Sequence, residues 1–128
     1  MIRCASAVLF ARDAKQLTAF YATALELPID HSDAVHAVLD AGGFKLIVHQ
    51  IPSPIASSIS ITDPPQRREE TAIRLNFIVD DVEKIRELAA RHRGAIDAAA
   101  PAWASSSATI RLGYDPEGNV FAIDTQES

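Results

Sequence analysis

The sequence lacks the features that mark several large classes of protein. It contains a single cysteine, Cys4, so no disulfide can form within the chain, as expected in a reducing compartment. Basic residues occur singly or in pairs and the net charge is -5, which argues against nucleic acid and anionic membranes as partners. No apolar run approaches the roughly 20 residues of a membrane span. We therefore expect a cytoplasmic, unprocessed protein.

Several common catalytic motifs are also missing from the sequence. There is no glycine-rich phosphate loop, no Cys/His cluster for zinc and no nucleophile-elbow pattern. His31, His36 and His92 fall in predicted turns, short strands or helix ends, where the ordinary interpretation is a solvated histidine. Cys4 is interpreted as a small residue of a buried strand in preference to a reactive thiol.

The chain contains two halves with the same order of predicted elements. In each half a strand leads to an aspartate that can cap a helix, Asp13 in the first and Asp81 in the second. An apolar stripe at three- and four-residue spacing follows each aspartate. The predicted strands are 2–10, 29–32, 35–40 and 44–51 in the first half, and 72–79, 95–98, 108–114 and 119–125 in the second. Gly94 is the expected stop of the second helix.

The two halves also align residue by residue. With Asp13 placed on Asp81, Leu17 falls on Ile85 and the rest of the helix stripe follows. Later in each half, Gly43 aligns with Gly118, which places Ile47 on Ala122 and His49 on Asp124. Each half therefore reads as a βαβββ module. One module cannot cover both faces of its sheet, so we expect the modules to pair, with helices outside and the other faces curled around side chains or a ligand.

A different composition separates the two modules. Residues 52–70 contain four prolines among serines and charged residues, without a sustained helical period. We interpret them as a linker, with a short strand at 59–61. The expected organisation is a single domain, 1–128, made of module one at 1–51, the linker at 52–70 and module two at 71–128.

Three stretches resemble the vicinal oxygen chelate superfamily, which includes glyoxalase I, extradiol dioxygenases and bleomycin-resistance proteins. Residues 20–27 resemble its helix end, residues 76–82 resemble its strand-to-helix entry, and Asp115-Pro116-Glu117-Gly118-Asn119 matches its hairpin turn. Glu26 departs from the pattern, because the family usually has glycine there. The resemblance implies an α+β fold in which paired βαβββ modules form a curled, mixed-sheet cup with helices on the outer face. It also implies that the functional pocket lies between paired modules, and the sequence leaves open whether these belong to one chain or to the two chains of a dimer.

The resemblance further implies a divalent metal held by the first and fourth strands of each module. The corresponding positions here are Ser6, Ile47, Arg74 and Ala122. Alanine and isoleucine offer no ligand atom, serine is a poor ligand, and an arginine repels a cation. The sequence therefore predicts no metal and no other cofactor at this place. A displaced site using His49, Asp124 and Asn76 stays open as an alternative.

Other cup residues are candidates for binding a ligand. Arg74 on an inner sheet face needs a partner, which is either an anionic or carbonyl-bearing ligand or the carboxylate of Asp124. The resemblance implies an aromatic residue near the pocket rim, and we expect Trp103 either to stack on a ligand or to cover the loop or a dimer contact. Arg111 also has a family counterpart, and we expect it to bind an anion or to form a salt bridge. The candidate ligand-binding residues are Ser6, His49, Arg74, Asn76, Trp103, Arg111 and Asp124. No catalytic residue is assigned.

Three functions are compatible with these residues. The resemblance, combined with the unsuitable metal positions, favours a homodimeric protein of the bleomycin-resistance type. In this function the protein binds a small molecule, either neutral or anionic, in a metal-free cup. The second is a lyase, isomerase or dioxygenase that uses a displaced divalent metal or acid–base chemistry by His49. The third is a structural or partner-binding domain whose cup is filled by side chains. The residues do not identify the ligand.

Overall fold

The computed structural model describes residues 1–126 of the chain. It divides into two compact units, of which the first is Met1–Ile61 and the second begins at Thr62. The division falls inside the segment 52–70.

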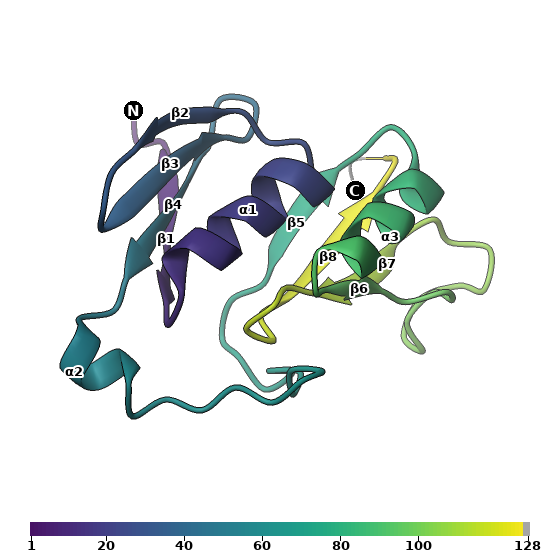
Figure 1. Cartoon of the computed structure of the whole chain (residues 1–128). Coiled ribbons are helices and arrows are strands. Elements are labelled where there is room, and N and C mark those ends of the chain that lie inside the picture. Colours follow the sequence, from purple (N-terminus) through teal and green to yellow (C-terminus); the bar gives the residue numbers. More distant parts are fainter. Residues whose placement is uncertain (127–128) are drawn as a thin grey trace. The chain divides into compact units, whose positions relative to one another are not determined.

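The first unit is a four-stranded sheet with a helix on one face (Figure 1). Its strands stand in the order β1-β4-β3-β2, with β1 parallel to β4 and the other neighbours antiparallel. Helix α1 packs against β1, β3 and β4. The elements are β1 Ser6–Ala11, α1 Ala14–Ala24, β2 Ile29–Ser32, β3 His36–Asp40, β4 Lys45–Gln50 and the short helix α2 Ser53–Ala56.

The second unit repeats this topology. Its strands stand in the order β5-β8-β7-β6, again with the first strand parallel to the fourth and the other neighbours antiparallel. The elements are β5 Leu75–Ile78, α3 Val82–Arg91, β6 Ala95–Ile96, β7 Arg111–Tyr114 and β8 Val120–Asp124. The two mixed sheets with few helices confirm the predicted α+β class and the βαβββ order of each half.

The register of the parallel strand pairs also repeats. Val8 of β1 lies opposite Ile47 of β4, and Asn76 of β5 lies opposite Ala122 of β8. These are the positions that the sequence alignment of the halves treats as equivalent. The repeat is therefore present in the strand pairing as well as in the sequence.

Both helices begin at the predicted aspartates. The Asp13 carboxylate accepts a hydrogen bond from the backbone N–H of Gln16 at 3.1 Å, and Asp81 accepts one from Lys84 at 3.2 Å. Such a bond satisfies one of the backbone donors that the first turn of a helix leaves unpaired. The buried stripe of α1 carries Ala14, Leu17, Phe20, Tyr21 and Ala24, and that of α3 carries Ile85 and Ala89.

The helix ends use left-handed residues other than glycine. Glu26 has φ 58° just after α1, at the position where the superfamily pattern has glycine, and the N–H of Leu27 bonds back to the carbonyl of Tyr21. After α3 the left-handed residue is Arg93, with φ 70°, and not the predicted Gly94. The N–H of Gly94 instead bonds to the carbonyl of Ala89, which closes the helix end.

We expect the substitution Glu26→Gly to stabilise the protein modestly. A β-carbon in the left-handed region destabilises the folded state by about 1–2 kcal/mol. Glycine removes this cost, but its greater conformational freedom stabilises the unfolded chain and offsets about half of the gain. The free energy of unfolding should rise by about 0.5–1 kcal/mol, as measured by urea denaturation. Glu26→Ala keeps the β-carbon and should show no such rise. An equal gain with alanine would mean that the glutamate side chain, and not the backbone, carries the cost.

Some predicted strands are longer than the observed ones. Sheet pairing of β1 begins at Ser6, opposite the first residue of β4, so residues 2–5 lie outside the sheet and Cys4 is exposed. The interpretation of Cys4 as a buried strand residue is therefore wrong. Pairing of β5 likewise begins at Leu75, opposite Phe121, and Ile73 before it is largely exposed.

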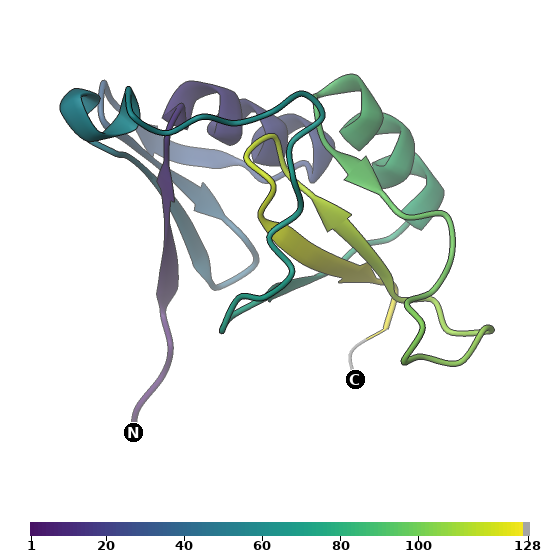
Figure 2. The same cartoon turned by 90° about the horizontal axis from the view of Figure 1, so that it is seen from below.

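The predicted strand at 59–61 is also absent from the described chain. The segment instead contains α2 and then runs as an extended trace without strand partners, until an isolated bridge joins Arg68 to Asn119 (Figure 2). Apolar residues alone did not make a strand here, because no neighbouring strand offers its backbone groups to this segment.

Candidate ligand-binding site

The sheet of the second unit has one well-buried face and one partly open face. Phe121 and Ile123 of β8 are almost fully buried on one face. On the other face Val120 and Asp124 are half-buried, and the small Ala122 between them is buried. Side chains alternate between the faces of a strand, so Val120 and Asp124 point to the opposite face from Phe121. Asn76 and Leu112 share that face, because both lie opposite Ala122 in the sheet register.

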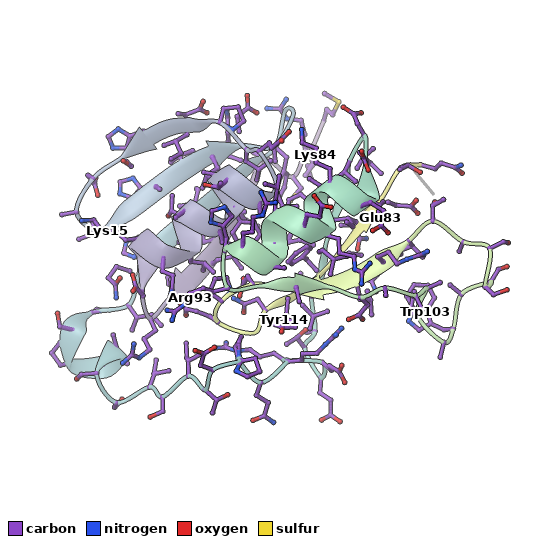
Figure 3. All side chains as sticks on the ribbon, turned by 45° about the vertical axis from the view of Figure 1, so that its right-hand side comes forward. Lys15, Glu83, Lys84, Arg93, Trp103 and Tyr114 are labelled. Atoms are coloured by element: carbon purple, nitrogen blue, oxygen red, sulfur yellow. The ribbon has the colours of Figure 1, made fainter. Side chains whose placement is uncertain are left out.

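Arg74 lies directly before β5, beside this open face. Its Nε donates a hydrogen bond to Oδ1 of Asn76 at 3.0 Å, and its guanidinium carbon lies 5.5 Å from the centre of the Trp103 ring. Trp103 belongs to the loop between β6 and β7 and is 65% exposed (Figure 3). Within residues 1–126, no carboxylate lies within ion-pair distance of Arg74.

Asp124, the alternative partner of Arg74, is engaged elsewhere. Its carboxylate accepts hydrogen bonds from the Thr109 hydroxyl and from the backbone N–H groups of Thr125 and Gln126. The Thr109 hydroxyl is the main reason that the pKa of Asp124 lies below its usual value, since hydrogen bonds to the charged form favour it. The ion pair between Arg74 and Asp124 that the sequence left open is not formed.

A pocket of about 790 Å³ lies next to Arg74 in this unit. Its apolar lining comes from Trp103, Leu112, Val120 and the alanine-rich loop 98–102. Among its other polar residues, Arg67 forms ion pairs with both Glu69 and Asp97.

Arg67 is the second cation of the pocket, and its charge is compensated. Its Nη1 lies 2.7 Å from Oδ1 of Asp97, and its Nε lies 3.2 Å from Oε1 of Glu69, a contact that is an ion pair without hydrogen-bond geometry. The hydrogen bond to Asp97 is the main cause that raises the pKa of the Arg67 guanidinium. Arg74 therefore carries the charge of this pocket that is available to a ligand.

The structure does not bring Arg111 to the same place. Its Nη1 donates to the carbonyls of Ala108 and Ile110 at 2.8 and 2.9 Å, and its strand position lies opposite Ile123, which belongs to the buried face. The family resemblance suggested an anion-binding role or a salt bridge for Arg111. Its observed partners are backbone carbonyls of its own loop.

Ser6 and His49 belong to the first unit. Both are exposed on the face of the sheet that α1 leaves uncovered, where Val8 and Phe10 are exposed as well. His49 has its Nδ1 3.0 Å from the carbonyl of Gln50, and its ring lies 6.0 Å from that of Phe10. Within residues 1–126, Nε2 of His49 forms no hydrogen bond.

The four superfamily metal positions do not fit a metal ion. Ala122 is almost completely buried and has no ligand atom, and Ile47 on the equivalent strand of the first unit has none either. Arg74 directs its guanidinium to Asn76 and Trp103, where a dication would be repelled. We derive no metal-dependent step from these positions.

The structure shows one cluster that the sequence interpretation missed. The side chains of His31, Asp33 and His36 place one ligand atom each within 4.8 Å of one another, in the first unit. The interpretation of His31 and His36 as merely solvated, and of the sequence as free of a histidine cluster, was therefore incomplete. The available signal was the spacing His-x-Asp-x-x-His across a predicted hairpin turn.

Two βαβββ units with the same parallel strand pairing define the structural class of this protein. The sequence model of the glyoxalase-like domain matches residues 6–123, and the chain belongs to this family. A comparison with curated protein sequences found no significant match. No helix within residues 1–126 is both long and apolar enough to cross a membrane.

Solved structures show the same fold at low sequence identity. A glyoxalase/bleomycin resistance protein/dioxygenase family enzyme from Burkholderia phytofirmans has a TM-score of 0.69 at 20% identity, covering 96% of this chain and 98% of that one. The bleomycin-binding protein of Streptomyces verticillus, solved with copper(II)-bleomycin, has a TM-score of 0.60 at 20% sequence identity, covering 99% of this chain and 98% of that one. The fosfomycin resistance protein FosX of Listeria monocytogenes has a TM-score of 0.66 at 14% sequence identity, covering 99% of this chain and 94% of that one.

Proposed function

We propose that this protein binds a small molecule that carries an anionic group and a flat apolar part, on the open face of the second unit. The observation that supports this most is Arg74, whose guanidinium lies over the exposed Trp103 ring with no carboxylate partner among residues 1–126. A guanidinium binds carboxylate, sulfonate or phosphate oxygens through paired hydrogen bonds. The anionic group accepts hydrogen bonds from the remaining N–H donors of Arg74, while Trp103, Leu112 and Val120 contact the apolar part of the ligand.

The proposed role is binding without a metal at the superfamily positions. The residue types at those positions support a metal-free role. The proposed interaction of the Arg74 charge with an anionic ligand supports it too. A homodimer and a cytoplasmic location remain predictions that come with this proposal. The exposed Val8 and Phe10 are compatible with a contact to a second copy.

Trp103 provides a direct test, because it is the only tryptophan of the chain. Its fluorescence therefore comes from a single residue, which lines this pocket. The probe is anilinonaphthalene sulfonate, which is anionic and aromatic, and the comparison is phenylnaphthylamine, which is aromatic and uncharged. We expect saturable energy transfer from Trp103 to the sulfonate probe. A charge-assisted hydrogen bond contributes about 1.5–3 kcal/mol, so Arg74→Gln should weaken binding of that probe about tenfold to a hundredfold.

The control variant is Arg91→Gln, which makes the same change of net charge at the exposed end of α3. It should leave the affinity for the sulfonate probe unchanged, and neither variant should alter the affinity for the uncharged probe. An equal loss in both variants would show attraction by net charge alone. Binding that is indifferent to Arg74, or absent from the native protein, would contradict the proposal.

A further inference from the structure

The first unit carries a group of metal-ligating side chains that the proposed ligand site does not use. His31 lies on β2, His36 begins β3, and Asp33 lies in the turn between the two strands. His31 lies opposite Val38 and His36 opposite His49, so both histidines occupy the face of the sheet that α1 leaves open. The hairpin thus brings the three side chains together from one short stretch of sequence.

The distances between the ligand atoms suit a small divalent cation. Nε2 of His31 lies 3.5 Å from Oδ2 of Asp33, and Nδ1 of His36 lies 3.0 Å from the same oxygen. Ligands at about 2.0–2.2 Å from a tetrahedral zinc ion are roughly 3.3–3.6 Å apart from one another. These two separations are close to that value, and all three ligand atoms lie within 4.8 Å of one another.

Asp33 is held in the orientation that a ligand needs. Its Oδ1 accepts hydrogen bonds from the backbone N–H groups of Val35 and His36, at 2.9 and 3.0 Å. These two bonds fix the carboxylate across the turn, with Oδ2 near both imidazoles. Oδ1 also lies 3.0 Å from Nδ1 of His36.

The surroundings support the histidines and leave room beside them. The His49 ring stacks on that of His36 at 6.1 Å between centroids, with the planes tilted by 24°. Both imidazoles lie on the face of the sheet that α1 leaves open, and His31 is exposed. Water can therefore occupy the coordination positions that the protein does not fill.

We propose that His31, Asp33 and His36 form a binding site for a borderline divalent metal ion, of the zinc, nickel or copper type, at the β2–β3 turn. Two imidazoles and one carboxylate are ligands that such ions prefer over magnesium or calcium. The site is distinct from the superfamily metal positions, and it does not depend on ligand binding at Arg74. A bound cation links β2 to β3 and to the turn between them.

The test is a titration of the tag-free, full-length protein with Zn²⁺ alone, followed by calorimetry and by metal analysis after dialysis. We expect one saturable equivalent and a higher unfolding temperature in the presence of Zn²⁺, because the ion binds only the folded arrangement. His31→Gln and His36→Gln should each weaken binding at least about tenfold. Asp33→Asn should do the same while its amide oxygen still accepts the two turn hydrogen bonds.

His92→Gln is the matched control, because His92 follows α3 in the second unit, outside the proposed site. It should leave Zn²⁺ binding unchanged. With Cu²⁺ in place of zinc, electron paramagnetic resonance should show coupling to two imidazole nitrogens in the native protein and to one in His31→Gln. Zn²⁺ affinity that is equal in the native protein and all three ligand variants would overturn the proposal, as would an equal loss in His92→Gln.

Discussion

Replacing Gly118 with alanine is expected to lower the free energy of unfolding by about 1.5–4 kcal/mol. Gly118 has φ 84°, and a β-carbon there would lie 2.1 Å from the carbonyl oxygen of Gln66, which is a backbone atom that cannot rotate away. The left-handed conformation contributes about 0.5–1 kcal/mol after the offset from the stiffer unfolded chain, and the overpacking contributes about 1–3 kcal/mol. The clash also disturbs the hydrogen bond from the Arg68 N–H to the Gly118 carbonyl.

Gly42→Ala is the control for this prediction. Gly42 has φ 73° in the turn between β3 and β4, but nothing lies within 4 Å of the position of its β-carbon. It should therefore lose only the conformational part, about 1 kcal/mol. Urea denaturation of both variants measures the difference. Equal losses would mean that the chain around Gln66 moves aside at no cost.

Replacing Asp115 with alanine is expected to cost about 3 kcal/mol of stability. The Asp115 side chain is fully buried, and its Oδ1 accepts hydrogen bonds from the backbone N–H groups of Glu117 and Asn119, at 2.9 and 3.0 Å. Its Oδ2 accepts a further bond from the side-chain amide of Asn119 at 2.9 Å. Each buried donor that loses its acceptor costs about 1–3 kcal/mol, and the neighbouring β7 and β8 depend on the turn.

Asp115→Asn is the informative comparison. Its side-chain oxygen can still accept from the two backbone N–H groups, whereas its amide nitrogen faces the amide of Asn119 as a second donor. We expect it to lose less than half of what the alanine variant loses, as measured by the midpoint of urea unfolding. A loss as large as that of alanine would assign the stability to the negative charge and not to the geometry of the turn.

Much of the fold was predictable because local chemistry determines it. Asp13 and Asp81 cap helices through their own side chains, and a hydrogen bond between Asp115 and Asn119 stabilises the turn 115–119. In each case the residue that determines the local structure lies within a few residues of its hydrogen-bond partner. Strand ends were less predictable. Ile73 has the pattern of a buried strand residue, yet pairing with β8 begins only at Leu75. Strand length depends on a partner that is distant in the sequence.

The site was predictable in part for the same reason. Alternation along the strands correctly indicated which residues share a face with Asn76, but it could not show that Thr109 engages Asp124 or that Arg111 bonds to its own loop. Those contacts depend on the conformation of the loop 97–110. The proximity of His31 and His36 was also hidden, because it depends on the irregular register between β2 and β3.

The matched register of the two sheets means that this chain contains two equivalent backbone arrangements. Their uncovered faces carry different side chains. Positions that face the helices carry the packing of each unit, whereas most positions on the uncovered faces carry little of it, as the exposure of Phe10, His49 and Asn76 shows. After a gene duplication, the uncovered faces could thus change their chemistry at little cost to folding. The same separation makes this chain a practical scaffold for engineering, in which one uncovered face is redesigned while the other serves as an internal reference.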